Sequence, residues 1–254
     1  NHDFSGLDLS HMALHGQNLT NIDFYGTVLR HTDLSFSNLT GSHLSGANMR
    51  YANLEGADLS GSDLSNVYIY KANLKDANLE GADFSKANFC GLELEGKTFT
   101  DSDLSYADLS FTNLRFADLT KANLIGANLR GANLHSANLS EKDLSNIKFI
   151  DANLVNVNFT NSNLDNADFR GSNLKLVDLS FASLNGTYFF DVDLTGINLS
   201  NVDISDSDFT TQLSKKDLFT SNNKIDLSKY DLRGINLHGE YLEGLDFSNK
   251  NLSG

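Results

Sequence analysis

Residues that commonly carry catalysis or bind metals are few or scattered in this sequence. The seven histidines are dispersed, and only His11 and His31 have the spacing to stack in the repeat described below. Two imidazoles without a fixed carboxylate partner are a weak basis for a metal site or for acid–base catalysis. Ser and Asp occur throughout, so a Ser/His/Asp grouping has no diagnostic value, and there is no Gly-rich phosphate loop. The sequence predicts no catalytic residues, no metal and no cofactor: we expect that the chain is not an enzyme.

Cysteine content and net charge exclude further classes. Cys90 is the single cysteine, which rules out an intramolecular disulfide framework and a thiolate metal cluster. A formal charge of −14 excludes a nucleic-acid binder of the usual basic kind, because phosphate neutralisation requires an excess of Lys and Arg. No run of residues is long and apolar enough to form a membrane-spanning helix. We therefore expect no direct contact with nucleic acid and no membrane span.

A five-residue repeat organises most of the chain. Every fifth residue from Phe4 to Phe209 is Leu, Phe, Ile or Met, and this register never slips. The residue two positions earlier is usually small and often Ala, and the residue between them is usually Asp or Asn. The run 122–139 shows the resulting unit, A-D/N-L-x-x, without interruption. The sequence is therefore built from repeats, and the repeat determines its fold.

A period of five residues fits neither an α-helix nor a flat strand, because neither keeps every fifth side chain on one side. A chain that turns by about a quarter of a revolution per unit does keep the large central residue and the small residue facing inward. The Asp or Asn between them then occupies a turn, where its side chain can accept a backbone hydrogen bond. Twenty residues make one coil, and coils pair through backbone bonds, which fits the absence of Pro.

This unit resembles that of the pentapeptide-repeat family. The resemblance implies an all-β fold, a right-handed quadrilateral β-helix of about ten and a half coils over residues 1–210, with a divergent C-terminal segment. Residues 211–226 lack the repeat and are expected to form a linker or short helix, and 227–254 a second-register terminal coil or cap. The chain starts at Asn1 inside a repeat, so we expect it to be a piece of a longer protein.

Two charged residues occupy positions that the register directs inward. Lys97 and Lys142 each lie where most units place a small residue. An unpaired charge is costly in an apolar interior. We therefore expect at each lysine either a local bulge or an extended side chain that carries its ammonium group outward.

The acidic charge has a regular arrangement. Residues 211–254 contain six basic and six acidic residues, so the net charge of −14 belongs entirely to residues 1–210. On one expected face, aspartates recur at multiples of twenty residues and form an acidic column: Asp3, Asp23, Asp63, Asp83, Asp103, Asp143 and Asp203. The resemblance implies a DNA mimic as one alternative, since family members that confer quinolone resistance bind DNA gyrase. The other interpretation is turn chemistry, because Asp and Asn alternate at this position.

The adjacent face has no net charge and carries arginines and aromatic residues, which are enriched in protein interfaces. We call it the arginine face, and we predict that it binds a protein partner of unknown identity. Its candidate partner-binding residues are Arg30, Arg50, Tyr51, Tyr70, Lys71, Phe111, Arg130, Arg170 and Phe190. Scattered surface aromatics with no function are the alternative.

Three functional hypotheses follow. The first is a rigid, non-enzymatic scaffold that presents the arginine face, as part of a longer, effector-like bacterial protein in the bacterial cytoplasm or secreted into a host cell. The second is an acidic DNA mimic with a topoisomerase such as gyrase as its partner. The third is a part of a multidomain enzyme whose catalytic domain lies outside this chain.

Overall fold

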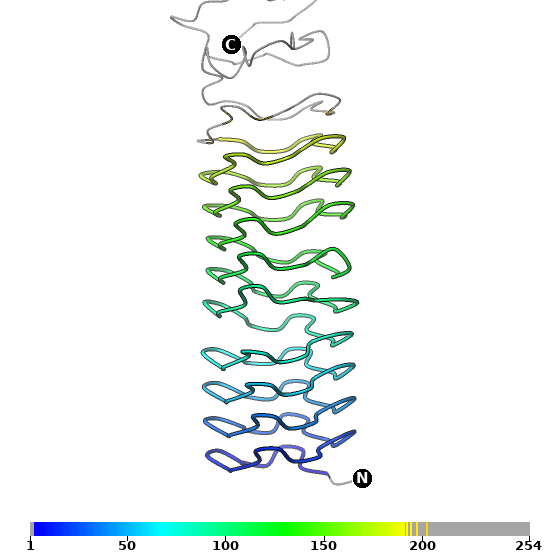
Figure 1. Ribbon diagram of the computed structural model, residues 1–254, viewed down its shortest axis with the longest axis vertical. Coiled ribbons are helices and arrows are strands. Elements are labelled where there is room, and N and C mark those ends of the chain that lie inside the picture. Colours follow the sequence, from blue (N-terminus) through cyan, green and yellow to red (C-terminus); the bar gives the residue numbers. More distant parts are fainter. Residues whose placement is uncertain (1–2, 191, 193, 195–196, 198–201, 203–254) are drawn as a thin grey trace, which may run out of the picture.

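The computed structural model describes residues 3–190 and the single positions 192, 194, 197 and 202. Figure 1 shows these residues as a stack of similar coils along one axis, running from the N-terminal coil (blue) to the yellow coils. Parallel bridges join most Asp/Asn positions to the residue twenty positions later, as in Asp3↔Asp23 and Asp168↔Tyr188. One coil is therefore four five-residue units, as the repeat predicts.

The coils pair through single residues, with turns between them. Within the described residues there is neither an α-helix nor a continuous strand, because every extended position is an isolated bridge. No helix in this part of the chain has the length and apolar character needed to cross a membrane. The expected all-β character is thus realised as a ladder of bridging residues rather than as long strands.

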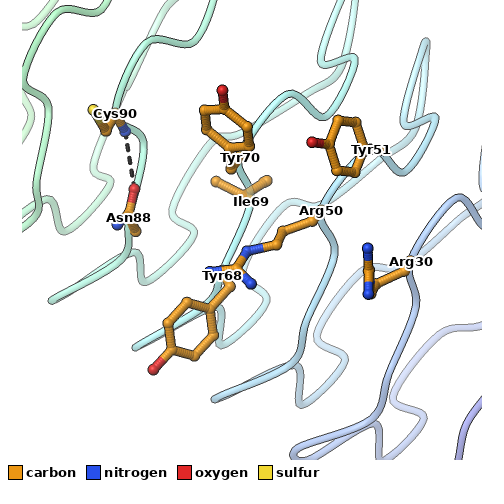
Figure 2. Close-up of a pocket in the computed structure, with 8 residues that line it drawn as sticks. All are labelled: Arg30, Arg50, Tyr51, Tyr68, Ile69, Tyr70, Asn88 and Cys90. Carbon is orange, nitrogen blue, oxygen red and sulfur yellow. Dashed lines mark hydrogen bonds between the residues drawn. The ribbon is translucent and has the colours of Figure 1, made fainter.

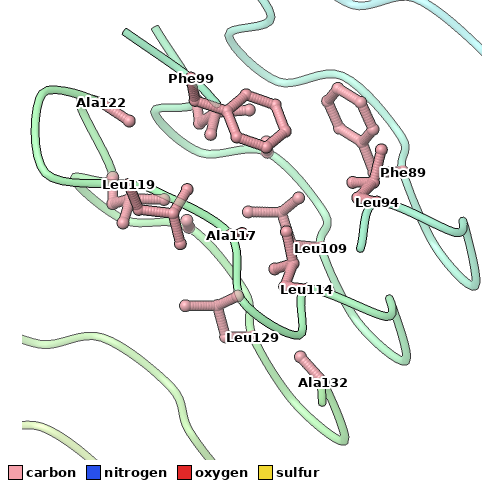
Figure 3. Packing of buried hydrophobic residues seen from close by; sticks show 14 of the residues in the cluster. Phe89, Leu94, Phe99, Leu109, Leu114, Ala117, Leu119, Ala122, Leu129 and Ala132 are labelled. Atoms are coloured by element: carbon pink, nitrogen blue, oxygen red, sulfur yellow. The ribbon is translucent and has the colours of Figure 1, made fainter. Parts of the chain in front are cut away.

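Large and small apolar side chains fill the interior in the predicted register. Central residues from Phe24 to Phe189 are buried, together with the alanines two positions before them. Figure 3 shows such side chains from successive sides of neighbouring coils, among them Phe89, Leu94 and Ala117, pointing into the shared interior. Identical positions stack along the axis, so that the rings of Phe149 and Phe169 lie 5.1 Å apart. Burying each large side chain contributes about 2 kcal/mol.

Most corners combine a side-chain acceptor with a left-handed residue. The Asp or Asn side chain accepts the amide N–H two residues later, as Asp63 does from Ser65 at 3.0 Å. The residue that follows this donor has a positive φ, even where it is aromatic, as in Phe36 (φ 56°) and Tyr106 (φ 56°). That conformation is unfavourable for bulky residues. The regular coil imposes it at every fifth residue from Gly6 to Gly186 except Lys121, which lies at the second of the two interruptions described below.

The ladder is interrupted at two places, and each contains an inward lysine. No backbone hydrogen bond of ordinary length joins residues 69–79 to residues 88–98, or residues 119–127 to residues 138–148, although the bridges Tyr68↔Asn88 and Asp118↔Asn138 still mark where each interruption begins. Lys97 Nζ instead donates to Ala77 O at 3.1 Å, and Lys142 Nζ donates to Ala122 O at 2.6 Å. These are the carbonyls that the amides of Thr98 and Asp143 would take in an unbroken ladder. We call the two interruptions the first and the second seam.

Each seam also contains a large inward aliphatic residue, Leu92 in the first and Ile147 in the second, whereas the ladder beside the smaller inward Val67 is intact, since Tyr68 N donates to Ala47 O at 3.0 Å. The lysines differ in carrying an ammonium group that must find an acceptor. Burial lowers the pKa of both Lys97 and Lys142, and neighbouring carboxylates oppose this shift. The sequence predicted a bulge or an outward ammonium group at each lysine; the structure instead shows an interrupted ladder in which the ammonium group takes over a backbone acceptor.

Several predictions from the sequence lie outside the described residues. These are the coils beyond residue 190 that complete the count of ten and a half, the end of the β-helix at residue 210, the linker 211–226 and the terminal coil 227–254. They remain predictions.

Candidate protein-interaction face

The aspartates of the acidic column lie one above another. Bridges pair Asp3 with Asp23, Asp63 with Asp83, and Asp83 with Asp103. Between Asp23 and Asp63 lies His43, whose Nδ1 and Nε2 are 3.2 Å and 3.4 Å from their carboxylate oxygens. Asp203 lies outside the described residues.

Every described member of the acidic column also accepts the amide N–H two residues later. The acceptors are Asp3, Asp23, Asp63, Asp83, Asp103 and Asp143. Asp103 and Asp143 each accept a further bond from an asparagine of the next coil, Asn123 and Asn163. The carboxylates therefore have a structural role in the corners, whatever else they do.

On the arginine face, the four arginines divide into two pairs. Arg130 lies 3.1 Å from Asp151, and Arg170 lies 2.6 Å from Asp168. Arg30 and Arg50 make no ion pair within 4 Å in the described part of the chain. The positive charge of Arg30 contributes to lowering the pKa of Asp8, but less than the hydrogen bonds from Ser10 do. Two of the four guanidinium groups on this face therefore have no carboxylate partner among the described residues.

Aromatic rings accompany the two unpaired arginines. The rings of His11, His31 and Tyr51 form one continuous stack, with centroid separations of 4.9 Å and 4.8 Å. Tyr51 meets Tyr70 edge-on at 5.9 Å. Lys71 Nζ lies 5.4 Å from the centre of the Tyr70 ring, so this lysine belongs to the same group.

A pocket of about 430 Å³ lies where these side chains meet (Figure 2). Four of the residues predicted from the sequence line it, and they come from three successive coils: Arg30, Arg50, Tyr51 and Tyr70. The prediction missed Tyr68, Ile69, Asn88 and Cys90, which complete the lining. The Arg50 guanidinium lies 5.4 Å from the centre of the Tyr68 ring. Tyr68 could have been noticed, because it replaces Asp or Asn at a corner of this face.

The remaining candidates lie away from the pocket. The Phe111 ring covers Gly131 so closely that a Cβ at the glycine would lie 2.6 Å from it. Phe36 and Tyr106 cover Gly56 and Gly126 in the same way. These exposed aromatic rings thus pack on the next coil, a contact that the sequence did not predict. Phe190 is exposed at the far end of the described coils.

Comparison with known proteins identifies the repeat. The profile for pentapeptide repeats matches the chain in overlapping segments from residue 3 to residue 210. A comparison with curated proteins found no match.

Solved structures of repeat proteins are similar to the chain. HetL, a pentapeptide repeat protein involved in heterocyst differentiation regulation in the cyanobacterium Nostoc sp. strain PCC 7120, is 26% identical, with 82% of this chain and 87% of HetL covered and a TM-score of 0.45. Trypsin-treated QnrB1, a plasmid-mediated fluoroquinolone resistance protein, is 14% identical, with coverages of 79% and 88% and a TM-score of 0.33. A thylakoid-lumen protein of Arabidopsis thaliana is 26% identical, with coverages of 50% and 71% and a TM-score of 0.22. On the repeat match, the chain belongs to the pentapeptide-repeat family.

Proposed function

We propose that this protein is a non-enzymatic scaffold whose arginine face binds another protein. The observation that carries the proposal is the group of unpaired Arg30 and Arg50 beside exposed tyrosines. Residues 28–31, 48–51, 68–71 and 88–91, which form this part of the face, contain three basic residues and no Asp or Glu. Such a group is unusual in a chain of charge −14, and its composition is that of an interface centre.

The regular backbone favours binding as the function. Coils held by backbone bonds keep Arg30, Arg50, Tyr51 and Tyr70 in fixed register, so little freedom is lost when a partner binds. Arg130, Arg170, Phe111 and Phe190 then form the outer part of the face. Because two of these are paired arginines and Phe111 packs on glycine, we expect them to contribute less than the pocket residues.

The test uses two sets of alanine substitutions on different faces, three residues in the first set and two in the second. The first set is Arg50→Ala, Tyr51→Ala and Tyr70→Ala, and the second is Tyr106→Ala and Phe116→Ala, both exposed aromatics elsewhere. Proteins retained by the wild type are identified, purified and measured against all three proteins. We expect a loss of about 100-fold or more for the first set and about twofold for the second. Equal affinity of the first set and the wild type would refute the proposal.

A second candidate function is the acidic DNA mimic, which the stacked carboxylates of the acidic column favour. Acting against it, His43 lies within this column, and each described carboxylate is already an acceptor in a corner. A gyrase supercoiling assay with and without the protein tests this candidate. Inhibition that disappears when Asp63, Asp83 and Asp103 are changed to Asn would support mimicry, and unchanged supercoiling would exclude gyrase as the target.

The organisation beyond residue 190 also stays a proposal. We propose that the β-helix continues to residue 210, that 211–226 link it to a terminal coil at 227–254, and that the chain is part of a longer bacterial protein. The alternative of a multidomain enzyme requires a catalytic domain outside this chain. The full open reading frame, read for such a domain, decides between them.

A further inference from the structure

The pocket on the arginine face coincides with the first seam. Ile69 and Tyr70 line it from one side of the seam, and Asn88 and Cys90 line it from the other. On the other described coils of this face, the central residue and the residue two positions later donate their amides to the next coil, as Met49 does to Tyr68 O at 2.8 Å. The pocket therefore opens where this face loses its ladder.

Losing the ladder leaves backbone groups without partners at the pocket. In the described part of the chain, the Lys71 amide makes no hydrogen bond and the Cys90 carbonyl accepts none, and the Ile69 amide makes no hydrogen bond of ordinary length to the Asn88 carbonyl, although Tyr68 and Asn88 still form a parallel bridge. Ile69 is buried in the coil but lines the pocket, so a ligand in the pocket lies close to this residue. An unsatisfied buried amide costs about 1–3 kcal/mol. A ligand that supplies complementary groups recovers part of this cost.

Arg30 and Arg50 add positive charge at the same place. Both guanidinium groups are exposed and unpaired, and the coil repeat places them about 4.8 Å apart along the axis. Guanidinium groups bind carboxylates through two parallel hydrogen bonds. The tyrosines around them, Tyr51, Tyr68 and Tyr70, provide aromatic walls for an apolar or aromatic side chain.

We infer that the pocket binds a short acidic peptide segment of the protein partner, with a carboxylate held by Arg30 and Arg50. Its backbone bonds to the free amides and carbonyls of the seam, and a neighbouring side chain lies between the tyrosines. A peptide fits better than a simple anion, because the seam offers carbonyl acceptors as well as amide donors. This inference rests on the proposed function, and it gives Lys97 a positioning role, since that side chain holds the seam open from another side of the coil.

The probes are a blocked peptide with four glutamates around a central tyrosine and its twin with four glutamines. Binding is followed by NMR at low salt, where electrostatic attraction is least screened. We expect the glutamate peptide to shift the amide signals of Ile69 and Lys71, and the glutamine peptide to bind at least about tenfold more weakly. Equal binding of the two peptides, or unmoved Ile69 and Lys71 signals, would overturn the inference.

A matched pair of double variants isolates the two free arginines. Arg30→Gln with Arg50→Gln should weaken binding of the glutamate peptide about tenfold or more, whereas Arg130→Gln with Arg170→Gln, on the same face but already ion-paired, should change it by about twofold at most. Equal losses in both would show general charge attraction and would contradict the assignment.

Lys97→Ala provides an independent arm. It leaves all four arginines in place, but it should close the seam and reduce peptide binding to the level of the Arg30/Arg50 variant. Unchanged peptide binding in Lys97→Ala would contradict the role of the seam. If the glutamate peptide fails to bind while the Arg50/Tyr51/Tyr70 variant still loses its protein partner, the acidic-segment inference falls and the proposed function stands.

Discussion

Replacing Lys97 by Ala should stabilise the protein, although it removes a hydrogen-bonded side chain. Ala is the residue at this position in the neighbouring coils, at Ala77 and Ala117. With Lys97 gone, Ala77 O can accept from Thr98 N, and the facing residues of the first seam can pair again. Each recovered backbone bond contributes about 1 kcal/mol. Loss of the partly buried lysine methylenes costs about 1 kcal/mol in total. Recovery of about half of the missing bonds then gives a net gain of about 2–3 kcal/mol.

Urea unfolding, followed by circular dichroism, measures this gain as a higher midpoint. Lys175→Ala serves as the control, because Lys175 is exposed and lies outside both seams. We expect no more than about 0.5 kcal/mol of change in the control. A Lys97→Ala protein that is less stable than the wild type would refute the reasoning, since it would show that the lysine bridges the coils more strongly than the ladder it replaces.

Three further predictions concern the lysines, the corners and the glycines. Burial lowers the pKa of both inward lysines below 10.5, so the unfolded chain binds more protons than the folded chain near that pH, and stability should rise as pH rises toward 10.5. Urea midpoints at pH 8 and pH 10 measure this rise. A fall in the wild type that is absent from a double lysine-to-alanine variant would contradict the prediction. Hydrogen bonds from Thr120 lower the pKa of Asp118, so the stabilisation of the fold by this carboxylate should be present above pH 3.8 and be lost as pH falls further. An Asp118→Asn protein that unfolds at the same acid midpoint as the wild type would contradict this prediction. In Gly56→Ala the new Cβ would lie 2.6 Å from the Phe36 ring, so this substitution should destabilise the protein by about 1–2 kcal/mol more than Gly46→Ala. Gly46 is the control because it has a similar positive φ but open space around its Cα. Equal thermal midpoints of the two variants would exclude the packing of Phe36 on Gly56.

The repeat made most of the described fold predictable. Once every fifth residue from Phe4 is known to be large and apolar, the twenty-residue coil and the buried interior follow from chain geometry. The columns of side chains follow from the same register, which places Arg30, Arg50 and Tyr70 in one column. The repeat also identifies Lys97 and Lys142 as exceptions, because it defines the inward position that most units fill with a small residue.

The pocket could not be predicted in this way, because periodicity fixes columns but not the spacing between coils. The seam depends on Lys97, which lies on a different side of the coil from Tyr70 and affects it through the backbone ladder. The ion pair of Arg130 with Asp151 depends on side-chain reach across neighbouring coils, which the register does not specify. The sequence predicts Phe111 as an interface residue, because its packing on Gly131 depends on how the ring is turned, which the repeat does not specify.

Amide hydrogen exchange of the wild-type protein, followed residue by residue, tests most directly that the ladder is broken at the two inward lysines. The account predicts slow exchange at Met49, Leu54 and Leu59, whose amides donate to the next coil, and fast exchange at Ile69, Leu74 and Leu79, which face the first seam. The amides of Leu119 and Leu124 should also exchange fast. Equal protection of the two groups of central residues would contradict the account, and with it the origin of the pocket.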